Sequence, residues 1–183
     1  MAPLLALVTA AALQMATPEF KTYQPEIAAV DTPVTRRPRA IEHNDFYYVR
    51  LTVHRDASYA IIPLFVTEYA LGSALFAHPP GSDGTRTAHA VVGAGLIGVF
   101  GLNTVTGTWN LWDSRHDSPG RARRWIHASL MLLSDAGFVA TEAVAPGRRS
   151  VLVDPSRKRL HRTLAYASMG LALSGYGMML VWK

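Results

Sequence analysis

The chain has 183 residues, of which 49% are hydrophobic and only 17% are charged, and its mean hydropathy is +0.12. Because a soluble domain usually carries about 25% charged residues, this composition favours a chain surrounded by lipid, and it excludes a disordered one. The absence of cysteine excludes disulfides, thiolate zinc sites, cysteine nucleophiles and the thioether anchor of c-type haem. A formal net charge of +5 suits a basic membrane protein as well as a nucleic-acid-binding protein.

Two segments precede the first long apolar run. Residues 1–16 are apolar and contain small residues, which predicts a signal peptide; because a basic start is missing, an uncleaved N-terminal anchor is the alternative. Residues 17–50 are rich in proline and carry charges of both signs. Since proline interrupts regular structure, we predict an irregular extramembrane arm there.

Four apolar runs follow, each about 20 residues long, which is the length that crosses a hydrocarbon core of about 30 Å. They cover residues 57–77, 88–112, 125–145 and 164–182. We therefore predict an all-α fold, an integral membrane four-helix bundle formed by residues 51–183. Three acidic residues lie inside the runs, Glu68, Asp135 and Glu142. Because carboxylates are costly in a bilayer, each is a candidate for proton relay or for structural pairing.

The distribution of basic residues predicts the orientation, because Lys and Arg are enriched in cytoplasmic loops. The largest basic cluster follows the third run and comprises Arg148, Arg149, Arg157, Lys158, Arg159 and Arg162. This end is expected to be cytoplasmic, with the N-terminal arm on the periplasmic side of a bacterial-type inner membrane. The four tryptophans, Trp109, Trp112, Trp125 and Trp182, fall at the opposite face, where an aromatic belt is expected.

Four of the seven histidines occur one per run, near its N-terminal end: His54, His89, His127 and His161. Because successive helices are antiparallel, His54 and His127 are expected near the outer face and His89 and His161 near the inner face. Facing imidazoles on two helices are what axial ligation of a b-type haem iron requires. We predict two haem b groups roughly 20 Å apart by helix rise, or a single one held by His89 and His161 if an outer ligand fails.

The residue one turn after each histidine is expected to lie on the same helix face. These residues are Ser58, Gly93, Met131 and Ala165, and three of the four are small enough to admit a flat macrocycle. Gly93 is accordingly predicted to contribute to cofactor binding. The competing interpretation is that the four histidines are interfacial or form structural hydrogen bonds between helices. His43, His78 and His116 are interpreted as solvated or interfacial residues.

The second half of the chain weakly repeats the first. His54, Glu68, Pro79, His89 and Trp109 correspond to His127, Glu142, Pro146, His161 and Trp182, at offsets between 67 and 74 residues. The first helix then repeats as the third and the second as the fourth, with the same direction. This pattern predicts a parallel repeat about an axis along the membrane normal.

With these features the sequence resembles the cytochrome b561 family over about residues 50–183. The resemblance is carried by His54, by His89 within TAHAVVGAGL, by His127 within WIHASL and by His161 within LHRTLAYASMG. It implies a four-helix core that holds two haem b groups, with the first helix paired with the third and the second with the fourth. It also implies transmembrane electron transfer, in some members from ascorbate to a ferric or monodehydroascorbate acceptor. The chain departs from the family because eukaryotic members add flanking helices and short bacterial members use another helix pattern.

A glycine motif in the second apolar run suggests a different function, dinucleotide binding. Gly93, Gly95 and Gly98 spell G-x-G-x-x-G, the signature of a dinucleotide-binding turn, but the surrounding strand, helix and acidic residue are missing. Ala90, Ala94 and Gly98 instead predict a close-packing ridge on a membrane helix. Nucleic-acid binding is excluded because it needs a soluble basic face.

Two hypotheses result. The first is a membrane cytochrome that carries electrons across the bilayer through two bis-histidine haems, with a quinone, a small reductant or a partner redox protein as its partner besides the lipids. The second is a haem-free four-helix subunit that packs in a larger membrane complex. Whether the chain acts as an enzyme, a transmembrane oxidoreductase, stays open at this point.

Overall fold

The computed structural model describes residues 41–79, 81–146 and 154–182, which belong to one compact unit, Ala40–Lys183. In this part of the chain the regular structure is all helical, which confirms the predicted all-α class. The helices are α2 (Asp45–Ser58), α3 (Ile61–Ala77), α4 (Asp83–Asp113), α5 (Arg121–Ala143) and α6 (Pro155–Val181). The predicted signal peptide or anchor, residues 17–40 of the predicted arm, and Arg148 and Arg149 lie outside the described residues.

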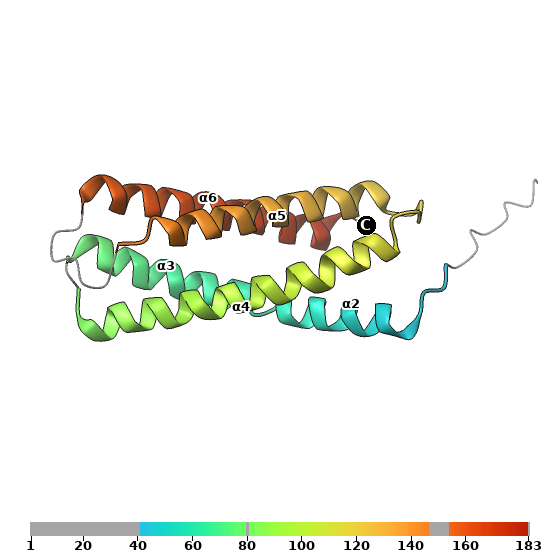
Figure 1. Ribbon diagram of the computed structural model, residues 1–183, viewed down its shortest axis with the longest axis horizontal. Coiled ribbons are helices and arrows are strands. Elements are labelled where there is room, and N and C mark those ends of the chain that lie inside the picture. The colour runs from blue at the N-terminus through green and yellow to red at the C-terminus, as the bar shows by residue number, and fades with distance from the viewer. Residues whose placement is uncertain (1–40, 80, 147–153, 183) are drawn as a thin grey trace, which may run out of the picture. The chain divides into compact units, whose positions relative to one another are not determined.

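Helices α2 and α3 together take the place of the first predicted run, with a break at Tyr59 and Ala60. Pro63 accounts for the break, because its ring nitrogen carries no hydrogen and leaves the carbonyl of Tyr59 without a helical donor. The N–H groups of Tyr59 and Ala60 instead donate to Asp56 and Ala57 at 3.3 and 3.1 Å. Since α2 and α3 both pack on α4, the four-helix arrangement is retained (Figure 1).

The helices begin earlier than hydropathy alone predicts, because polar side chains cap their N-termini. Asn44 accepts from the N–H of Tyr47 at the start of α2, and Ser82 does the same for Thr85 at the start of α4. The prediction that residues 45–50 belong to an irregular arm is therefore wrong, since they form the first turns of α2. As a result, His54 lies inside a helix and not ahead of one.

Helix α5 packs most extensively on α6, while α4 packs on α2, α3 and α5 (Figure 1). The contact between α5 and α6 is close because small residues meet there. A Cβ atom added at Gly137 would lie 2.1 Å from the hydroxyl of Ser168, and the hydroxyl of Ser134 donates to the carbonyl of Ser168 at 2.8 Å. In contrast, the ridge predicted on α4 is not found at Gly98, where an added Cβ meets nothing within 4 Å.

The apolar core occupies the middle of the helices. Phe65, Phe100 and Phe138 come from α3, α4 and α5, and their ring centroids lie 5.0 to 5.9 Å apart. The buried apolar residues around them are Ile61, Leu96, Met169 and Ala172. This aromatic core separates the two ends of the helices, where the histidines lie.

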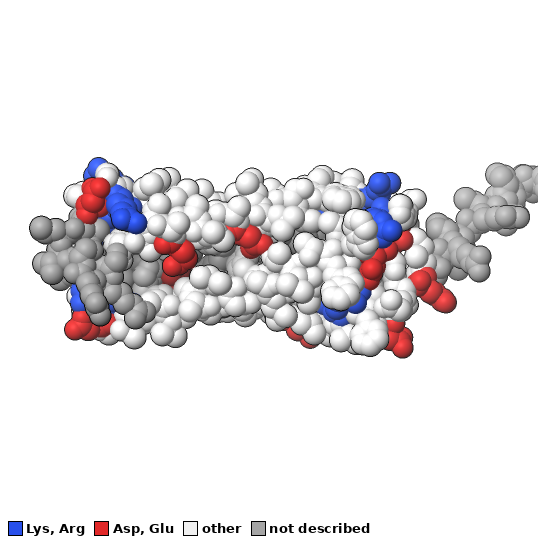
Figure 2. Space-filling view, viewed as in Figure 1, with Lys and Arg blue, Asp and Glu red and all other residues white. Residues whose placement is uncertain are grey.

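Outside this core, polar side chains face inward and apolar side chains face outward. The buried polar residues are Asn103, Thr106, Asn110, Ser114, Ser134, Thr141 and Ser168. Large apolar side chains such as Val66, Val105 and Val139 are 60 to 71% exposed. Figure 2 shows Lys and Arg gathered at the helix ends, with a largely uncharged surface between them in which acidic side chains appear. This distribution suits a lipid environment, because a protein in water buries its apolar surface.

Three helical stretches are long and apolar enough to cross a membrane: Asp45–Ala77, Asp83–Asp113 and Pro155–Val181. The prediction of four such spans is thus confirmed for three of them. Helix α5 has the length of a span, but Arg121, Arg123, Arg124, Asp135 and Glu142 reduce its hydropathy. It is a helix of the bundle that lacks the apolar composition of the other three.

Candidate functional site: two facing histidine pairs

The structure brings the four singled-out histidines together as two pairs, one toward each end of the helices. The first pair joins His54 of α2 and His127 of α5, whose ring centroids lie 6.1 Å apart with an angle of 81° between the ring planes. The second pair joins His89 of α4 and His161 of α6, at 6.3 Å and 77°. The predicted pairing of first with third helix and of second with fourth is therefore found in the geometry.

Both rings of the first pair donate from Nδ1 to the backbone of a neighbouring helix. Nδ1 of His54 lies 3.1 Å from the carbonyl oxygen of Asn103 and 3.2 Å from the hydroxyl of Thr106, both on α4. Nδ1 of His127 lies 3.0 Å from the carbonyl oxygen of Gly175 on α6. Because a carbonyl oxygen only accepts hydrogen bonds, each Nδ1 carries the proton and each Nε2 of the neutral ring keeps its lone pair.

The second pair is held similarly, with one difference. Nδ1 of His161 donates to the carbonyl oxygen of Thr141 on α5 at 2.9 Å. Nδ1 of His89 lies 3.0 Å from a carboxylate oxygen of Glu68 on α3, off the direction of a straight hydrogen bond. Three of the four rings therefore face a neutral carbonyl, and one faces a carboxylate.

These contacts repeat along the chain and support the predicted internal repeat. His54 binds the backbone 49 residues later, and His127 binds the backbone 48 residues later. In the second pair, His89 contacts Glu68 and His161 contacts Thr141, so each ring is held by the helix that precedes its own. The two halves thus place His54 and His127 in similar surroundings, whereas His89 and His161 each contact the preceding helix through a different group, a carboxylate and a carbonyl.

A cavity of about 120 Å³ lies at the first pair. Its wall includes both His54 and His127, together with apolar side chains such as Phe100 and Met131. Two buried amides also line it, Asn103 and Asn110, which are 4% and 7% exposed. The side chains of both amides have an atom to which no described residue hydrogen-bonds, Oδ1 of Asn103 and Nδ2 of Asn110.

Arg124 of α5 is the charged residue in the wall of this cavity. Its terminal nitrogens donate to the carbonyl oxygens of Pro119, Ser114 and Asp117 at 2.6 to 3.1 Å. Its Nε is buried and has no partner among the described residues. The residues that line the cavity therefore combine apolar side chains with two buried donors that have no partner in the described part of the chain, Nε of Arg124 and Nδ2 of Asn110.

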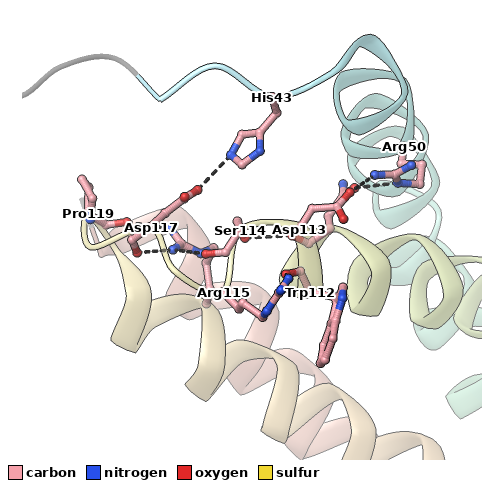
Figure 3. A network of polar contacts seen from close by, with 10 residues as sticks. His43, Arg50, Trp112, Asp113, Ser114, Arg115, Asp117 and Pro119 are labelled. Atoms are coloured by element: carbon pink, nitrogen blue, oxygen red, sulfur yellow. Dashed lines mark hydrogen bonds and ion pairs between the residues drawn. The ribbon is translucent and has the colours of Figure 1, made fainter.

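A network of polar contacts fixes the start of α2 against the end of α4 beside the first pair (Figure 3). Arg50 donates to Asn110 at 2.9 Å and also to Asp113, and its guanidinium lies 4.8 Å from the ring centroid of Trp109. His43, interpreted from sequence as solvated, is instead largely buried and lies 2.8 Å from a carboxylate oxygen of Asp117.

The four residues predicted to leave room for a macrocycle are Ser58, Gly93, Met131 and Ala165, and the structure gives each of them different contacts. An added Cβ at Gly93 would lie 3.2 Å from Glu68, so Gly93 makes room for that carboxylate beside His89. Ser58 donates to the carbonyl of His54 and accepts from Asn103, and Met131 lines the cavity of the first pair. Ala165 is partly buried on α6.

Two glycines that the sequence analysis missed contact the histidines directly. An added Cβ at Gly107 of α4 would lie 2.9 Å from Cε1 of His54, and one at Gly72 of α3 would lie 3.4 Å from Cε1 of His89. Each histidine ring therefore lies against the backbone of the helix beside it. Gly107 lies 53 residues after His54 and has no sequence signal of its own beyond its place on the helix that faces His54.

The three acidic residues inside the predicted apolar runs, Glu68, Asp135 and Glu142, have different surroundings. Asp135 of α5 accepts from the hydroxyl of Thr104 on α4, and its other oxygen is buried without a donor. Glu142 is exposed near the end of α5. Structural pairing thus describes Asp135, whereas Glu68 belongs to the surroundings of the second histidine pair.

Among the described residues there is no group of three or more His, Asp or Glu side chains that could hold a metal ion. Paired imidazoles are a different kind of arrangement, because a porphyrin supplies four further nitrogen ligands. No family model, curated protein or solved structure matches this chain.

Proposed function

We propose that the protein is a membrane-spanning b-type cytochrome that carries electrons between the two faces of a membrane through two bis-histidine haems. The observation that carries this proposal is the pair of facing imidazoles at 6.1 and 6.3 Å, one pair toward each end of the helices. The haems are not part of the structure, so their fit is judged from the side chains.

The separation of the rings fits one metal ion between them. A bond from a metal to an imidazole nitrogen is about 2 Å long and a ring centroid lies about 1 Å from the nitrogen, so two imidazoles that held one iron between them would have centroids about 6 Å apart. The steep angle between the ring planes is compatible with this arrangement, because both planes can contain the axis that joins the two nitrogens.

The protonation of the rings is also compatible with their binding a metal through Nε2. Histidines that bind metals usually donate the other ring N–H to a carbonyl or carboxylate, which fixes the tautomer and the ring orientation. Here all four Nδ1 atoms lie 2.9 to 3.1 Å from such an oxygen. The Nε2 atoms are left as the ligands of the iron in this proposal.

The cavity at the first pair offers polar groups suited to the carboxylates of a haem. Asn110 and Arg124 each have a buried donor without a partner in the cavity wall. Burying an unpaired donor is costly, and a carboxylate that accepts from both would remove this cost. The apolar side chains of the wall suit the faces of the macrocycle.

The two sites are arranged for transfer through the membrane. On α4, His89 of the second pair and Asn103, the residue that holds His54, are separated by about 21 Å of helix rise. The aromatic core formed by Phe65, Phe100 and Phe138 lies between these levels and excludes water. A bound haem iron supplies reversible one-electron reduction, and the protein holds, buries and tunes it. A quinol, a small reductant or a redox protein remains the predicted donor.

A visible spectrum of the purified full chain tests the proposal. We expect the reduced-minus-oxidised spectrum to show the bands of low-spin haem b, and these bands should fall by about half in His89→Ala. His78→Ala is the matched control, because His78 caps α3 at an exposed position outside both pairs. A folded but colourless protein would overturn the proposal and favour the haem-free structural subunit.

A further inference from the structure

The two histidine pairs differ in the group that faces one of their rings. Three of the four rings donate to backbone carbonyl oxygens, which are neutral, whereas His89 faces the carboxylate of Glu68. The contrast is internal to the molecule, because the repeat places His161 against the backbone at Thr141 where His89 meets Glu68. The second pair therefore carries a negative group that the first pair lacks.

Glu68 is held in this position by its neighbours. Its side chain is 13% exposed, and the absence of a Cβ at Gly93 leaves room for its Oε1 between α3 and α4. Its other oxygen is buried, and no donor from the described residues reaches it. The charge of the carboxylate is therefore directed at the imidazole of His89 and is not shared with a salt-bridge partner.

A carboxylate next to the N–H of a ligating imidazole increases the basicity of that ligand. A more basic ligand and a nearby negative charge both stabilise the oxidised, more positive state of an iron, so they lower its reduction potential. Building on the proposed function, we propose that Glu68 makes the second site, His89 and His161, the low-potential haem and the first site, His54 and His127, the high-potential haem. Electrons then pass downhill from the second site to the first.

Other charges at this end act more weakly on His89. Lys158 and Arg162 of α6 lie against Phe76, about 12 Å further along α3 than Glu68 by helix rise, so they are more distant from His89 than Glu68 is. Lys158 also donates to the carbonyl oxygens of Leu75 and Phe76. Glu142 is exposed near the end of α5.

A redox titration of the haem bands in lipid nanodiscs tests the inference. We expect two midpoint potentials in the wild-type protein, and Glu68→Gln should raise the lower one while leaving the higher one in place. Glu142→Gln is the matched control, since it removes a carboxylate near the same level without touching His89, and it should move the lower potential less. Two bound haems whose potentials do not change in Glu68→Gln would overturn the inference and leave the proposed function intact.

A second variant keeps the test valid if Glu68→Gln fails to fold or to bind haem. His127→Ala removes a ligand of the first site only and retains Glu68. The haem that remains should titrate at the lower of the two wild-type potentials. If it titrates at the higher potential, Glu68 does not set the order of the two sites. Protein without any haem would instead contradict the proposed function itself.

Discussion

At the scale of single residues, the site depends on which ring nitrogen carries the proton. Carbonyl oxygens of Asn103, Gly175 and Thr141 hold the Nδ1 protons of three rings and leave Nε2 as the lone-pair atom. An interfacial histidine needs no such uniformity, since either nitrogen would satisfy it. The tautomer shared by these three rings is therefore the residue-level feature that supports the proposed ligand set.

Gly107 provides a test of how tightly the first site is built. Because a Cβ at this position would come within 2.9 Å of Cε1 of His54, Gly107→Ala must displace the ring or the helix. We expect this variant to lose the haem of the first site and to retain that of the second, so the haem-to-protein ratio should fall by about half.

Gly101→Ala is the control for this variant. It makes the same change on the same helix at a position where an added Cβ meets nothing within 4 Å, and we expect it to keep both haems. Full haem content in Gly107→Ala would show that the ring of His54 does not need its present position.

The pairing of the histidines could be predicted from sequence, because one histidine per antiparallel helix alternates between the two ends. The contacts that orient the rings could not be predicted from sequence. Backbone carbonyls carry no residue identity, so the roles of Gly175 and Thr141 leave no trace in the sequence. Glu68 was recognisable as a costly intramembrane acid, but its contact with His89 depends on the rotation of α3 against α4.

At the scale of the helices, hydropathy predicted the C-terminal ends closely and placed the N-terminal starts too late. Apolar runs report the part of a helix that lies in lipid, whereas the start is decided by local capping and by proline. Asn44 begins α2 well before the apolar run, and Pro63 divides this stretch into α2 and α3. These polar extensions place His54 within a helix, where its ring is held.

The start of α6 gives a prediction about pH. The N–H and the hydroxyl of Ser156 donate to the carboxylate of Asp154, and these bonds hold the pKa of Asp154 below its ordinary value. A depressed pKa in the folded state stabilises the fold above the unfolded pKa of about 3.9. This contribution is lost as the pH falls through the lower, folded pKa. Asp154→Ala should therefore lower Tm at neutral pH, and its deficit should shrink in acid.

The Asp154→Asn variant separates the effect of the negative charge on Tm from the effect of helix capping. Asparagine caps a helix about as well as aspartate but does not titrate. The difference in Tm between the Asn and Ala variants should stay constant over the same pH range. Thermal unfolding in one detergent at a series of pH values checks this, and a wild-type advantage over Ala that persists unchanged below the folded pKa would contradict the role of the carboxylate.

At the scale of the whole molecule, the described helices bury polar side chains around an apolar core, expose large apolar side chains, and carry Lys and Arg at their ends. Composition predicted this arrangement, since a chain with few charges must expose apolar surface to something other than water. It did not predict that α5 would be less apolar than the other helices. The repeat also became clearer in three dimensions, because His54 and His127 share the kind of contact they make, with a backbone carbonyl oxygen, and not only their spacing.

The central claim is that the chain holds two haems, each between a defined pair of helices, and haem stoichiometry in double variants tests it most directly. Wild-type protein should bind two haems per chain. His54→Ala with His127→Ala removes both ligands of one site and should leave one haem. His54→Ala with His161→Ala breaks both sites and should leave none. Loss of both haems in the first double variant, or no haem in the wild-type protein, would contradict the two-site account.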